Sequence, residues 1–547
     1  RDFLLRHRTD YQLAYKGFEW PRMEHFNWAL EWFDVISENN DEIALWITGD
    51  SDTESKVSFS DLSKGSNRVA NFLRHRGVKR GDRLLLMLRN RQELWECMLA
   101  SMKLGVVVVP STVLLSESEV QDRLTRGVIN CVVTEADQTQ KFQSSSGVAT
   151  SIVVGEKALG WISYEEANEE ADTFEPDSVT CSKDPLLLYF TSGTTAEPKL
   201  VVHTHQSYPV GHLSTMYWIG LRPGDKHLNI SSPGWAKHAW SSFFAPWNAQ
   251  STVLVYGYDR FDGEKLMETI VSKEVTTLCA PPTVWRMLIK LPLENYPIKL
   301  REVVSAGEPL NPSVIEAVES AWGITPRDGF GQTETSALIG NSPGQDIKPG
   351  FMGRPMPGYE VSLRDLQGGL SQEGEITVST YSRPIGLMEG YLDRPIDPGD
   401  GYLTGDIAEM DDEGYIRFVG RNDDIFKSAD YRISPFELEN VLLRHPAVSE
   451  AAVVPSPHPT RLSVPKAFLV LNLDFQAGRE IALDIFRFCE AKVSPFKRIR
   501  RLEFSVLPKT ISGKIRRVEL RQLENLEHDS SKRGTTEFWE EDFKDIL

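Results

Sequence analysis

Apolar and polar positions alternate along the chain in a pattern that predicts strands separated by helices. Between Asp82 and Pro110 the strand-like run RLLLML is followed by the helical run QELWECMLASMKL and then by the strand-like run VVVVP. This is a βαβ order. Similar alternation returns at 251–256, 264–272, 276–280 and 303–305. We therefore predict an α/β fold in which helices cover the sheets.

The pattern changes after Gly358, where short strand-like runs are separated by Gly and Asp turns. It changes again beyond Arg421, where a helix is expected at Pro435–Arg444 and strands at 450–454 and 467–471. We predict a large N-terminal domain of helix-covered β-sheets over 1–422, with a small β-rich part at about 358–422, and a small mobile α+β C-terminal domain over 423–547. The last residues, 525–547, are charged and weakly periodic and are interpreted as a tail.

Composition narrows the class of protein. The 547 residues are too many for one ordinary core. The formal charge of -18 argues against nucleic acid as a partner, and no apolar run of about 18 residues predicts a transmembrane segment. The five scattered cysteines form no C-x-x-C pair, which argues against a disulfide framework or a zinc site. We expect a cytoplasmic protein, leaving a trimmed targeting peptide open; the oligomeric state is not indicated.

The strongest local signal is TSGTTAEPK at Thr191–Lys199, directly after the apolar run 186–190. A strand that ends in a small, hydroxyl-rich loop directs N–H groups and hydroxyls at phosphate oxygens, and the Lys balances their charge. The segment does not match the G-x-x-x-x-G-K-[ST] pattern. An ordinary Ser/Thr/Gly loop is the alternative interpretation.

Five further segments follow along the chain: SAGEPL (305–310), DGFGQTE (328–334), GYLTGDIAEMDDEGYIRFVGRNDDIFK (401–427), YRISPFELE (431–439) and PKTISGKIRR (508–517). Together with YFTSGTTAEPK they resemble the motifs of the AMP-forming acyl-CoA synthetases, part of the adenylate-forming superfamily. The resemblance runs from about residue 80 to about residue 520 and is greatest to the short- and medium-chain branch.

The resemblance implies roles for the N-terminal motifs. The loop at Thr191–Lys199 would grip the β- and γ-phosphates of ATP, and its departure is Ala196, where the family usually has Gly. Two segments, 307–309 and 328–330, would form the walls of the adenine slot. Thr333 would face the α-phosphate, and Glu334 would hold Mg²⁺. The residues assigned to ATP are Thr191, Ser192, Gly193, Thr194, Thr195, Lys199, Gly307, Glu308, Pro309, Asp328, Gly329, Phe330, Gly331 and Gln332, followed by Thr333 toward the α-phosphate and Glu334 as the metal ligand.

The resemblance also assigns roles near the predicted domain boundary. Asp406 and Arg421 match the family's ribose clamp, and Asp423 matches its hinge. Lys514 matches the lysine of the C-terminal motif. Because carboxylate attack on the α-phosphorus accumulates negative charge on oxygen, a mobile ammonium there lowers the barrier to adenylation. By itself Lys514 would be interpreted as a solvated loop lysine.

A second substrate, coenzyme A, is implied by the tunnel motif 431–439, which contains Arg432, and by the basic run SPFKRIRR. Arg500 matches best by spacing as a ligand of the coenzyme A phosphates; a solvated basic face is the alternative. The family often has Gly directly before the Tyr-Arg pair, whereas this chain has Asp430. The resemblance therefore supports adenylation more firmly than thioester formation.

The residues that bind the acid are the hardest part of the site to assign from the sequence. PGWAKHAWSSFFAPW (233–247) resembles the region in which Trp and Lys side chains border the acyl group, which assigns Trp235, Lys237 and Trp240. Core aromatics on a helix are the alternative. Residues 336–340 are a further candidate wall.

These features predict an AMP-forming acid–thiol ligase for a short- or medium-chain fatty acid, with ATP, Mg²⁺ and coenzyme A as cofactors or substrates. An aryl-acid CoA ligase and an adenylating enzyme that delivers to a separate carrier protein remain open. A regulator that lost its chemistry is disfavoured because Glu334 and Lys514 are present, and nothing requires a luciferase-like oxidation.

Overall fold

The structure of the chain is a computed structural model. It describes residues 1–49, 54–143, 147–191, 198–258, 260–365, 367–396, 399, 401–428, 431–458, 460–510, 513–526 and 533–543. Contacts divide the chain into two compact units, which we describe separately. Unit 1 comprises Arg1–Val361, Val378–Tyr402 and Asp412–Ile416, and unit 2 comprises Ser362–Thr377, Leu403–Asp411 and Arg417–Leu547. The predicted boundary at Asp423 lies inside unit 2 and stays a prediction.

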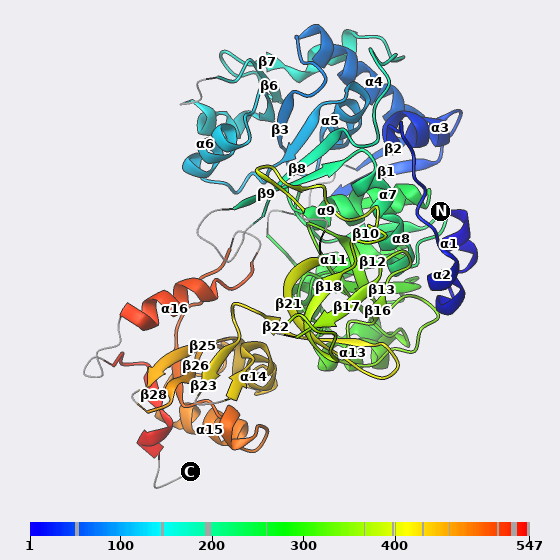
Figure 1. Cartoon of the computed structure of the whole chain (residues 1–547). Coiled ribbons are helices and arrows are strands. Elements are labelled where there is room, and N and C mark those ends of the chain that lie inside the picture. The colour runs from blue at the N-terminus through cyan, green and yellow to red at the C-terminus, as the bar shows by residue number, and fades with distance from the viewer. Residues whose placement is uncertain are drawn as a thin grey trace. The chain divides into compact units, whose positions relative to one another are not determined.

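One large sheet of unit 1 has the strand order β20-β19-β9-β8-β4-β3-β5-β6-β7 (Figure 1). From β8 to β7 neighbouring strands are parallel, whereas β9 pairs antiparallel with β8 and with β19. Its strands are β3 (Arg83–Met87), β4 (Val107–Pro110), β5 (Cys131–Glu135), β6 (Thr150–Val154), β7 (Ile162–Ser163), β8 (Pro185–Thr191), β9 (Lys199–Thr204), β19 (Gly390–Tyr391) and β20 (Arg394–Pro395). The central strands are almost wholly buried, as expected for parallel strands covered on both faces.

The second large sheet of unit 1 has the order β16-β15-β14-β13-β12-β10-β11-β1-β2. It is parallel from β1 to β14 and antiparallel at both ends. Its strands are β1 (Ile43–Gly49), β2 (Ser55–Ser58), β10 (Lys226–Asn229), β11 (Thr252–Gly257), β12 (Thr277–Ala280), β13 (Glu302–Ala306), β14 (Arg327–Gln332), β15 (Ser336–Gly340) and β16 (Arg354–Pro355).

The helices of unit 1 start and stop where the sequence provides caps. The Ser58 side chain accepts the N–H of Asp61 at the start of α4, Ser116 and Glu119 form a capping box at α6, and Gly105 ends α5 with a φ of 77°. The α-helices are α1 (Asp2–Arg6), α2 (Tyr11–Gly17), α3 (Asp34–Ser37), α4 (Phe59–His75), α5 (Gln92–Leu104), α6 (Glu117–Arg126), α7 (Ser207–Gly211), α8 (Leu213–Ile219), α9 (Ala236–Ala239), α10 (Ala245–Asn248), α11 (Gly263–Ser272), α12 (Pro282–Leu288) and α13 (Pro312–Trp322).

The predicted β-rich part is a four-stranded sheet, most of which belongs to unit 2, in the order β17-β18-β21-β22. Its strands are β17 (Val361–Arg364), β18 (Glu373–Val378), β21 (Tyr402–Met410) and β22 (Ile416–Arg421). Gly and Asp turns separate these strands, as the sequence predicted.

The rest of unit 2 is a small α+β assembly with its own apolar core. A sheet of order β25-β26-β27-β28 is accompanied by helices and by the short hairpin β23–β24. The elements are β23 (Phe426–Ser428), β24 (Tyr431–Ile433), α14 (Pro435–Leu442), β25 (Val448–His458), β26 (Leu462–Leu471), α15 (Arg479–Glu490), β27 (Arg501–Phe504), α16 (Arg517–Leu526) and β28 (Glu537–Trp539). The predicted α/β fold class is confirmed, and the predicted tail contributes β28, which pairs with β27.

Candidate active site

The candidate phosphate loop connects two paired strands of unit 1. Thr191 ends β8 and Lys199 begins β9, and the two residues face each other as an antiparallel pair. The loop therefore leaves and re-enters the sheet at one point. Lys199 is exposed, and its Nζ lies 5.0 Å from the ring centre of Tyr391. Ser192, Gly193, Thr194, Thr195 and Ala196 lie outside the described residues.

The two predicted adenine-slot segments are neighbours. Strands β13 and β14 are parallel, with Ala306 opposite Gly329. Gly307–Pro309 follows the carboxyl end of β13, and Phe330 is the next residue along β14, where its side chain is partly exposed. Gly307 has a φ of 110°, a conformation that side chains disfavour. The carboxyl edge of a parallel sheet is where α/β proteins bind ligands, so this placement suits a nucleotide base.

A buried carboxylate joins these two segments. Asp328 Oδ2 accepts the N–H of Leu310 at 3.1 Å, and its Oδ1 accepts the N–H of Gly329 at 2.9 Å. Burial raises the pKa of Asp328 to about 7, against the effect of the two backbone donors. Asp328 therefore fixes the loop after β13 against β14.

Thr333 and Glu334 occupy the turn between β14 and β15 and are held from outside their own motif. His203 Nε2 lies 2.7 Å from the carbonyl oxygen of Thr333, and its Nδ1 lies 3.0 Å from Ser207 Oγ. Because a carbonyl only accepts, Nε2 carries the proton. Burial lowers the pKa of His203 to about 4, so the ring is neutral at pH 7.

The Glu334 carboxylate is half-buried and accepts a hydrogen bond from the hydroxyl of Tyr391 at 3.2 Å. The backbone carbonyl of Glu334 accepts the N–H of Met388 at 2.8 Å. Burial, together with the nearby Glu334 carboxylate, raises the pKa of Tyr391, so its phenol stays protonated and donates. The β19–β20 hairpin thus orients the predicted metal ligand. Beside it, Gln332 Oε1 accepts from the hydroxyl of Tyr402 at 2.9 Å.

The structure places two of the three predicted acid-site residues against the nucleotide motifs. Lys237, on α9, reaches the carbonyl oxygen of Ala306 at 3.2 Å, beside the adenine loop. The Trp240 ring packs on Gly331 so closely that a Cβ there would lie 2.7 Å from its Cη2 atom. Trp240 Nε1 also donates to the Tyr208 hydroxyl at 2.8 Å. Trp235 precedes α9 and is partly exposed.

The helix that carries Trp240 is irregular. A π-helical turn spans Trp240–Phe244, and Ser242 inside it has non-helical φ and ψ. Such turns often accompany functional sites. Residues 336–340 form the buried strand β15, and the carbonyl oxygen of Ser336 lies 2.0 Å from where a Cβ on Gly331 would stand. Gly331 is therefore enclosed between Trp240 and β15.

In unit 2, the candidate ribose clamp and hinge lie together. Arg421 Nη1 is 3.3 Å from the buried Asp406 carboxylate, and Arg421 Nε is 3.5 Å from Asp423. The next residue, Asp424, forms ion pairs with Arg521 and, at 3.8 Å, with Arg517, which both lie on α16. The carboxylates around the predicted hinge therefore have different partners. Asp406 and Asp423 pair with Arg421, whereas Asp424 pairs with arginines of α16.

Lys514 lies on a hairpin of unit 2 and is exposed. The N–H of Thr510 donates to the Lys514 carbonyl at 2.7 Å, and Gly513 takes a φ of 84° at the turn. Three residues later, Arg517 forms a two-pronged ion pair with Glu439 of α14, at 2.9 and 2.6 Å. This pair fixes the base of the hairpin, while the Lys514 ammonium extends from it.

The basic run predicted to bind coenzyme A is paired with carboxylates. Lys497 lies 2.6 Å from Glu437, Arg498 lies 2.7 Å from Glu490, and Arg500 forms an ion pair with Glu540. Arg432 is exposed on β24. Its neighbour Tyr431 stacks on Phe496, with ring centres 4.3 Å apart. Asp430 lies outside the described residues.

Comparison with protein families tests this interpretation. The model described as "AMP-binding enzyme" matches residues 33–392, and that of the "AMP-binding enzyme C-terminal domain" matches residues 437–514. The chain belongs to the AMP-binding enzyme family. The two matches include the candidate phosphate, adenine and acid-site residues and end on Lys514.

Relatives extend over nearly the whole chain. The 4-hydroxybutyrate–CoA ligase 1 of Metallosphaera sedula is 41% identical over 94% of this chain and 94% of its own. The human mitochondrial acyl-coenzyme A synthetase ACSM3 is 36% identical, covering 94% of this chain and 92% of its own. Among solved structures, the anthranilate CoA ligase AuaEII with anthranoyl-AMP has a TM-score of 0.84 at 26% identity, covering 92% and 98% of the two chains. An acyl-CoA synthetase of Brucella canis has a TM-score of 0.74 at 29% identity, covering 95% and 99%.

The prediction of an ATP-dependent acyl-CoA synthetase is therefore confirmed at the level of family and reaction, with an acid, ATP and coenzyme A as its small-molecule reactants. None of the helices within the described ranges has the length and apolar character needed to cross a bilayer. The roles of individual residues in this AMP-binding enzyme stay predictions.

Sequence reasoning missed the residues that position the motifs. His203 and Tyr391 hold Thr333 and Glu334, and Tyr208 holds Trp240. His203 lies four residues after Lys199 on β9. The only feature of the sequence that could have drawn attention to His203 is the strand-like pattern that follows the phosphate loop. Nothing in the local sequence marks Tyr391.

Proposed function

We propose that this chain adenylates a short- or medium-chain aliphatic acid with ATP and then transfers the acyl group to coenzyme A. The observation that carries the proposal is the convergence at the carboxyl edge of β13 and β14. There Lys237 reaches the Ala306 carbonyl and Trp240 packs on Gly331. An acid bound beside this aromatic wall lies next to the segments that we assign to the nucleotide.

In the first step an oxygen of the acid attacks the α-phosphorus of ATP, the bond to the β-phosphate oxygen breaks, and pyrophosphate leaves. Phe330 and the Gly307–Pro309 segment take the adenine, and Thr191 and Lys199 hold the departing phosphates. Lys514 supplies positive charge to the nonbridging oxygens as the charge on them grows. The Asp406 carboxylate accepts hydrogen bonds from the ribose hydroxyls.

Magnesium fits the carboxylate that the structure orients. Within the described residues no group of three or more His, Cys, Asp or Glu is arranged to hold a metal. Mg²⁺ commonly binds through one or two carboxylates together with substrate phosphates, and the half-buried Glu334, oriented by Tyr391, suits that mode. When bound there, the ion would neutralise phosphate charge.

In the second step the thiol sulfur of coenzyme A attacks the acyl carbon, AMP leaves, and the thiol proton passes to solvent. We assign Arg432 and Arg500 to this step. The Glu540 partner of Arg500 would then exchange for a phosphate of coenzyme A. Rotation at Asp423 would present Lys514 for the first step and the 431–439 surface for the second.

The proposed acid class draws on the relatives as well as the site. The curated relatives reported above are named for 4-hydroxybutyrate and for acyl-coenzyme A synthesis, which does not favour an aryl acid. Trp240 supplies a flat apolar surface beside Gly331 that suits an alkyl chain of a few carbons.

The test measures pyrophosphate release with acids from acetate to laurate, 4-hydroxybutyrate and benzoate, and then AMP release with and without coenzyme A. We expect pyrophosphate with aliphatic acids and AMP only when coenzyme A is present. If pyrophosphate is released but AMP forms only when a phosphopantetheinyl carrier protein is added, the acceptor is that carrier protein and not coenzyme A. No pyrophosphate with any of the acids would refute the proposal.

The compartment is proposed separately. The described cysteines are all free thiols, which fits the cytoplasm, where thiols are kept reduced. A relative named as mitochondrial makes the mitochondrion the competing location. Fractionation of cells that express the full-length gene product separates the two locations.

A further inference from the structure

Unit 1 contains a cavity at the amino ends of its parallel strands, away from the phosphate loop. It is lined by residues at the starts of β3, β4 and β8, among them Arg83, Val107 and Pro185, and by Val202 of β9. The phosphate loop lies at the opposite end of β8. Because α/β proteins bind their main ligands at the carboxyl edge, this cavity is a separate site.

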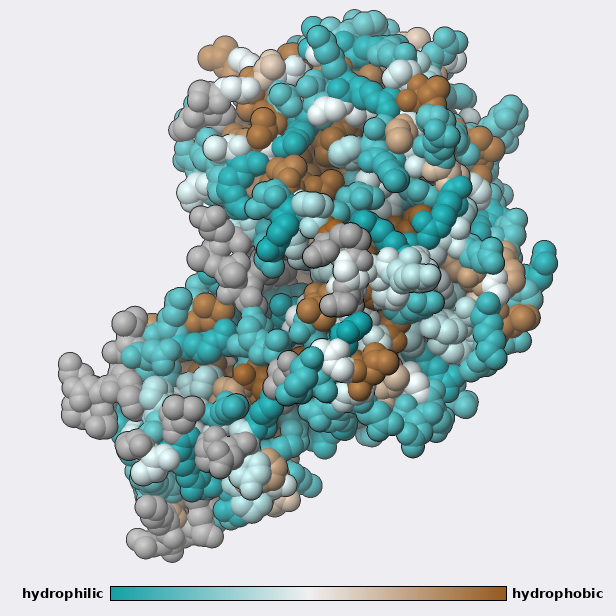
Figure 2. All heavy atoms as spheres, in the orientation of Figure 1, coloured by the Kyte–Doolittle hydropathy of each residue, from teal (hydrophilic) through white to brown (hydrophobic). Residues whose placement is uncertain are grey.

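The cavity has an apolar floor and a cationic rim. Val107, Leu188 and Val202 stand on one face of the sheet, with Leu188 paired to Val202, and Leu392 closes one side. Figure 2 shows atoms of apolar residues gathered over the part of unit 1 where β3 and β8 lie. The cavity volume is about 160 Å³. A dry protein cavity of about 150 Å³ accommodates benzene, so an alkyl chain of about six carbons fits.

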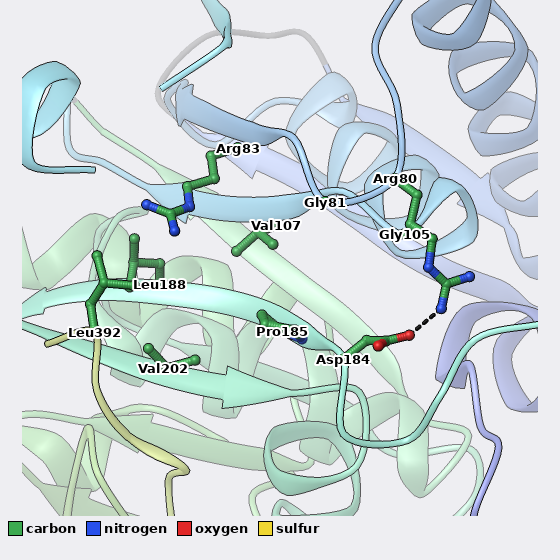
Figure 3. Close-up of a pocket in the computed structure, with 10 residues that line it drawn as sticks. All are labelled: Arg80, Gly81, Arg83, Gly105, Val107, Asp184, Pro185, Leu188, Val202 and Leu392. Carbon is green, nitrogen blue, oxygen red and sulfur yellow. Dashed lines mark hydrogen bonds and ion pairs between the residues drawn. The ribbon is translucent and has the colours of Figure 1, made fainter. Parts of the chain in front are cut away.

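The two arginines at the rim have different surroundings. Arg80 forms an ion pair with Asp184 and donates to the carbonyl of Val179 at 2.9 Å, so its charge is balanced. Arg83 Nη1 donates to the carbonyl of Gly127 at 2.7 Å, an uncharged partner. Figure 3 shows the Arg83 guanidinium directed toward the side of the cavity where Leu188 and Leu392 lie. A cation beside an apolar floor matches a carboxylate with a short alkyl chain.

We propose that this cavity is an accessory binding site for a short-chain aliphatic carboxylate, with the carboxylate on Arg83 and the chain over Val107, Leu188 and Val202. The site is distinct from the acid site at Trp240 and does not depend on catalysis.

The strands that line the cavity also lead to the phosphate loop, so an occupant of the cavity can influence that loop. Leu188 is on β8, which ends at Thr191, and Val202 is on β9, which begins at Lys199. The N–H of Leu392 donates to the carbonyl of Leu200 at 2.8 Å, and the adjacent Tyr391 contacts Glu334. A bound carboxylate would therefore contact β8 and β9, which flank the phosphate loop, and Leu392, which is next to Tyr391, and we expect it to change the affinity for ATP. That consequence rests on the proposed function.

Calorimetry with hexanoate tests the binding site. The whole protein is first saturated with a non-hydrolysable acyl-adenylate analogue, which blocks the active site. We expect one hexanoate per chain, with a Kd of about 1 mM, as is typical of so small a ligand. Val202→Phe fills the cavity and should abolish this binding. Arg83→Gln keeps a donor for Gly127 but loses the charge, and should weaken binding roughly tenfold or more.

Arg76→Gln is the matched control, because Arg76 pairs with Glu166 outside the cavity, and it should bind hexanoate as the wild type does. No hexanoate on the saturated protein, or unchanged binding by Val202→Phe, overturns the proposal. If the analogue does not bind, the proposed function is at fault, and the wild-type and Val202→Phe titrations without it still test the cavity.

Discussion

Asp328 accepts the N–H of Leu310 at 3.1 Å and so ties the segment after β13 to β14. The carboxylate is buried, and its pKa is raised to about 7. The two walls assigned to adenine are therefore joined by a group that titrates near neutral pH. An ionised carboxylate accepts both N–H groups better than a protonated one, whereas burial favours the protonated form.

Asp328→Asn should change how stability depends on pH. In the wild type the carboxyl pKa is about 7 in the folded state and 3.8 by default, so the folded state holds the proton more tightly. This contribution is complete below pH 3.8 and is lost as the pH rises toward 7. At about 1.4 kcal/mol per pKa unit, the whole effect is at most roughly 4 kcal/mol.

The measurement is urea unfolding between pH 5 and 8, with the wild type compared to Asp328→Asn. The free energy of unfolding of the wild type should fall relative to that of the variant as the pH rises. Asp365→Asn, at an exposed turn, should run parallel to the wild type. Parallel curves for Asp328→Asn as well would show that Asp328 is ionised throughout this range.

Tyr391→Phe should weaken the use of magnesium. Without the hydroxyl, the Glu334 carboxylate loses the donor that lies 3.2 Å away in the wild type. A lost hydrogen bond to a charged group costs about 1.5–3 kcal/mol, so we expect the Mg²⁺ concentration for half-maximal pyrophosphate release to rise about tenfold. Tyr381→Phe is the control, because Tyr381 is fully exposed at 101%. An equal Mg²⁺ requirement in the two variants would contradict the role of Tyr391.

The motif residues could be proposed from the sequence because each motif is continuous along the chain. The alternation also predicted a strand at 303–305, which lies within β13, but it gave no strand at 327–332, so the pairing of Ala306 with Gly329 was not foreseen. The residues that position the motifs could not be predicted from the sequence, because they act through contacts between residues far apart along the chain. His203 meets Thr333 across 130 positions, and Tyr391 meets Glu334 across 57; no periodicity encodes such a pair.

The basic run at 497–501 shows a different limit. A count of Lys and Arg predicts an open anion site, but the structure gives Lys497, Arg498 and Arg500 carboxylate partners on other elements. Those partners, Glu437, Glu490 and Glu540, are brought in by α14, α15 and the C-terminal segment. Charge along the sequence therefore overstates the charge available to a ligand.

Gly331→Ala should move Trp240. The new Cβ would stand 2.0 Å from the Ser336 carbonyl and 2.7 Å from the Trp240 ring, so the ring or β15 must shift. Overpacking of this kind costs about 1–3 kcal/mol. We expect a lower melting temperature and a KM for the acid raised several-fold in the pyrophosphate assay. Gly478→Ala is the control, because nothing lies within 4 Å of its Cβ. An unchanged KM for the acid would place the acyl chain away from Trp240.

Lys514→Ala should separate the two half-reactions. The Lys514 ammonium extends from a hairpin whose base is fixed by the Arg517–Glu439 pair, so truncation should leave the hairpin folded. Loss of a charge that stabilises the transition state typically costs about 10²–10³ in rate. Pyrophosphate release should fall by that factor, while thioester formation from supplied acyl-adenylate stays near the wild-type rate. Lys509→Ala removes a lysine of the same hairpin that pairs with Glu450 at 2.7 Å and should retain both activities. Equal loss of both steps in Lys514→Ala would mean that Lys514 serves one fixed arrangement of the chain, and the rotation at Asp423 would have to be abandoned.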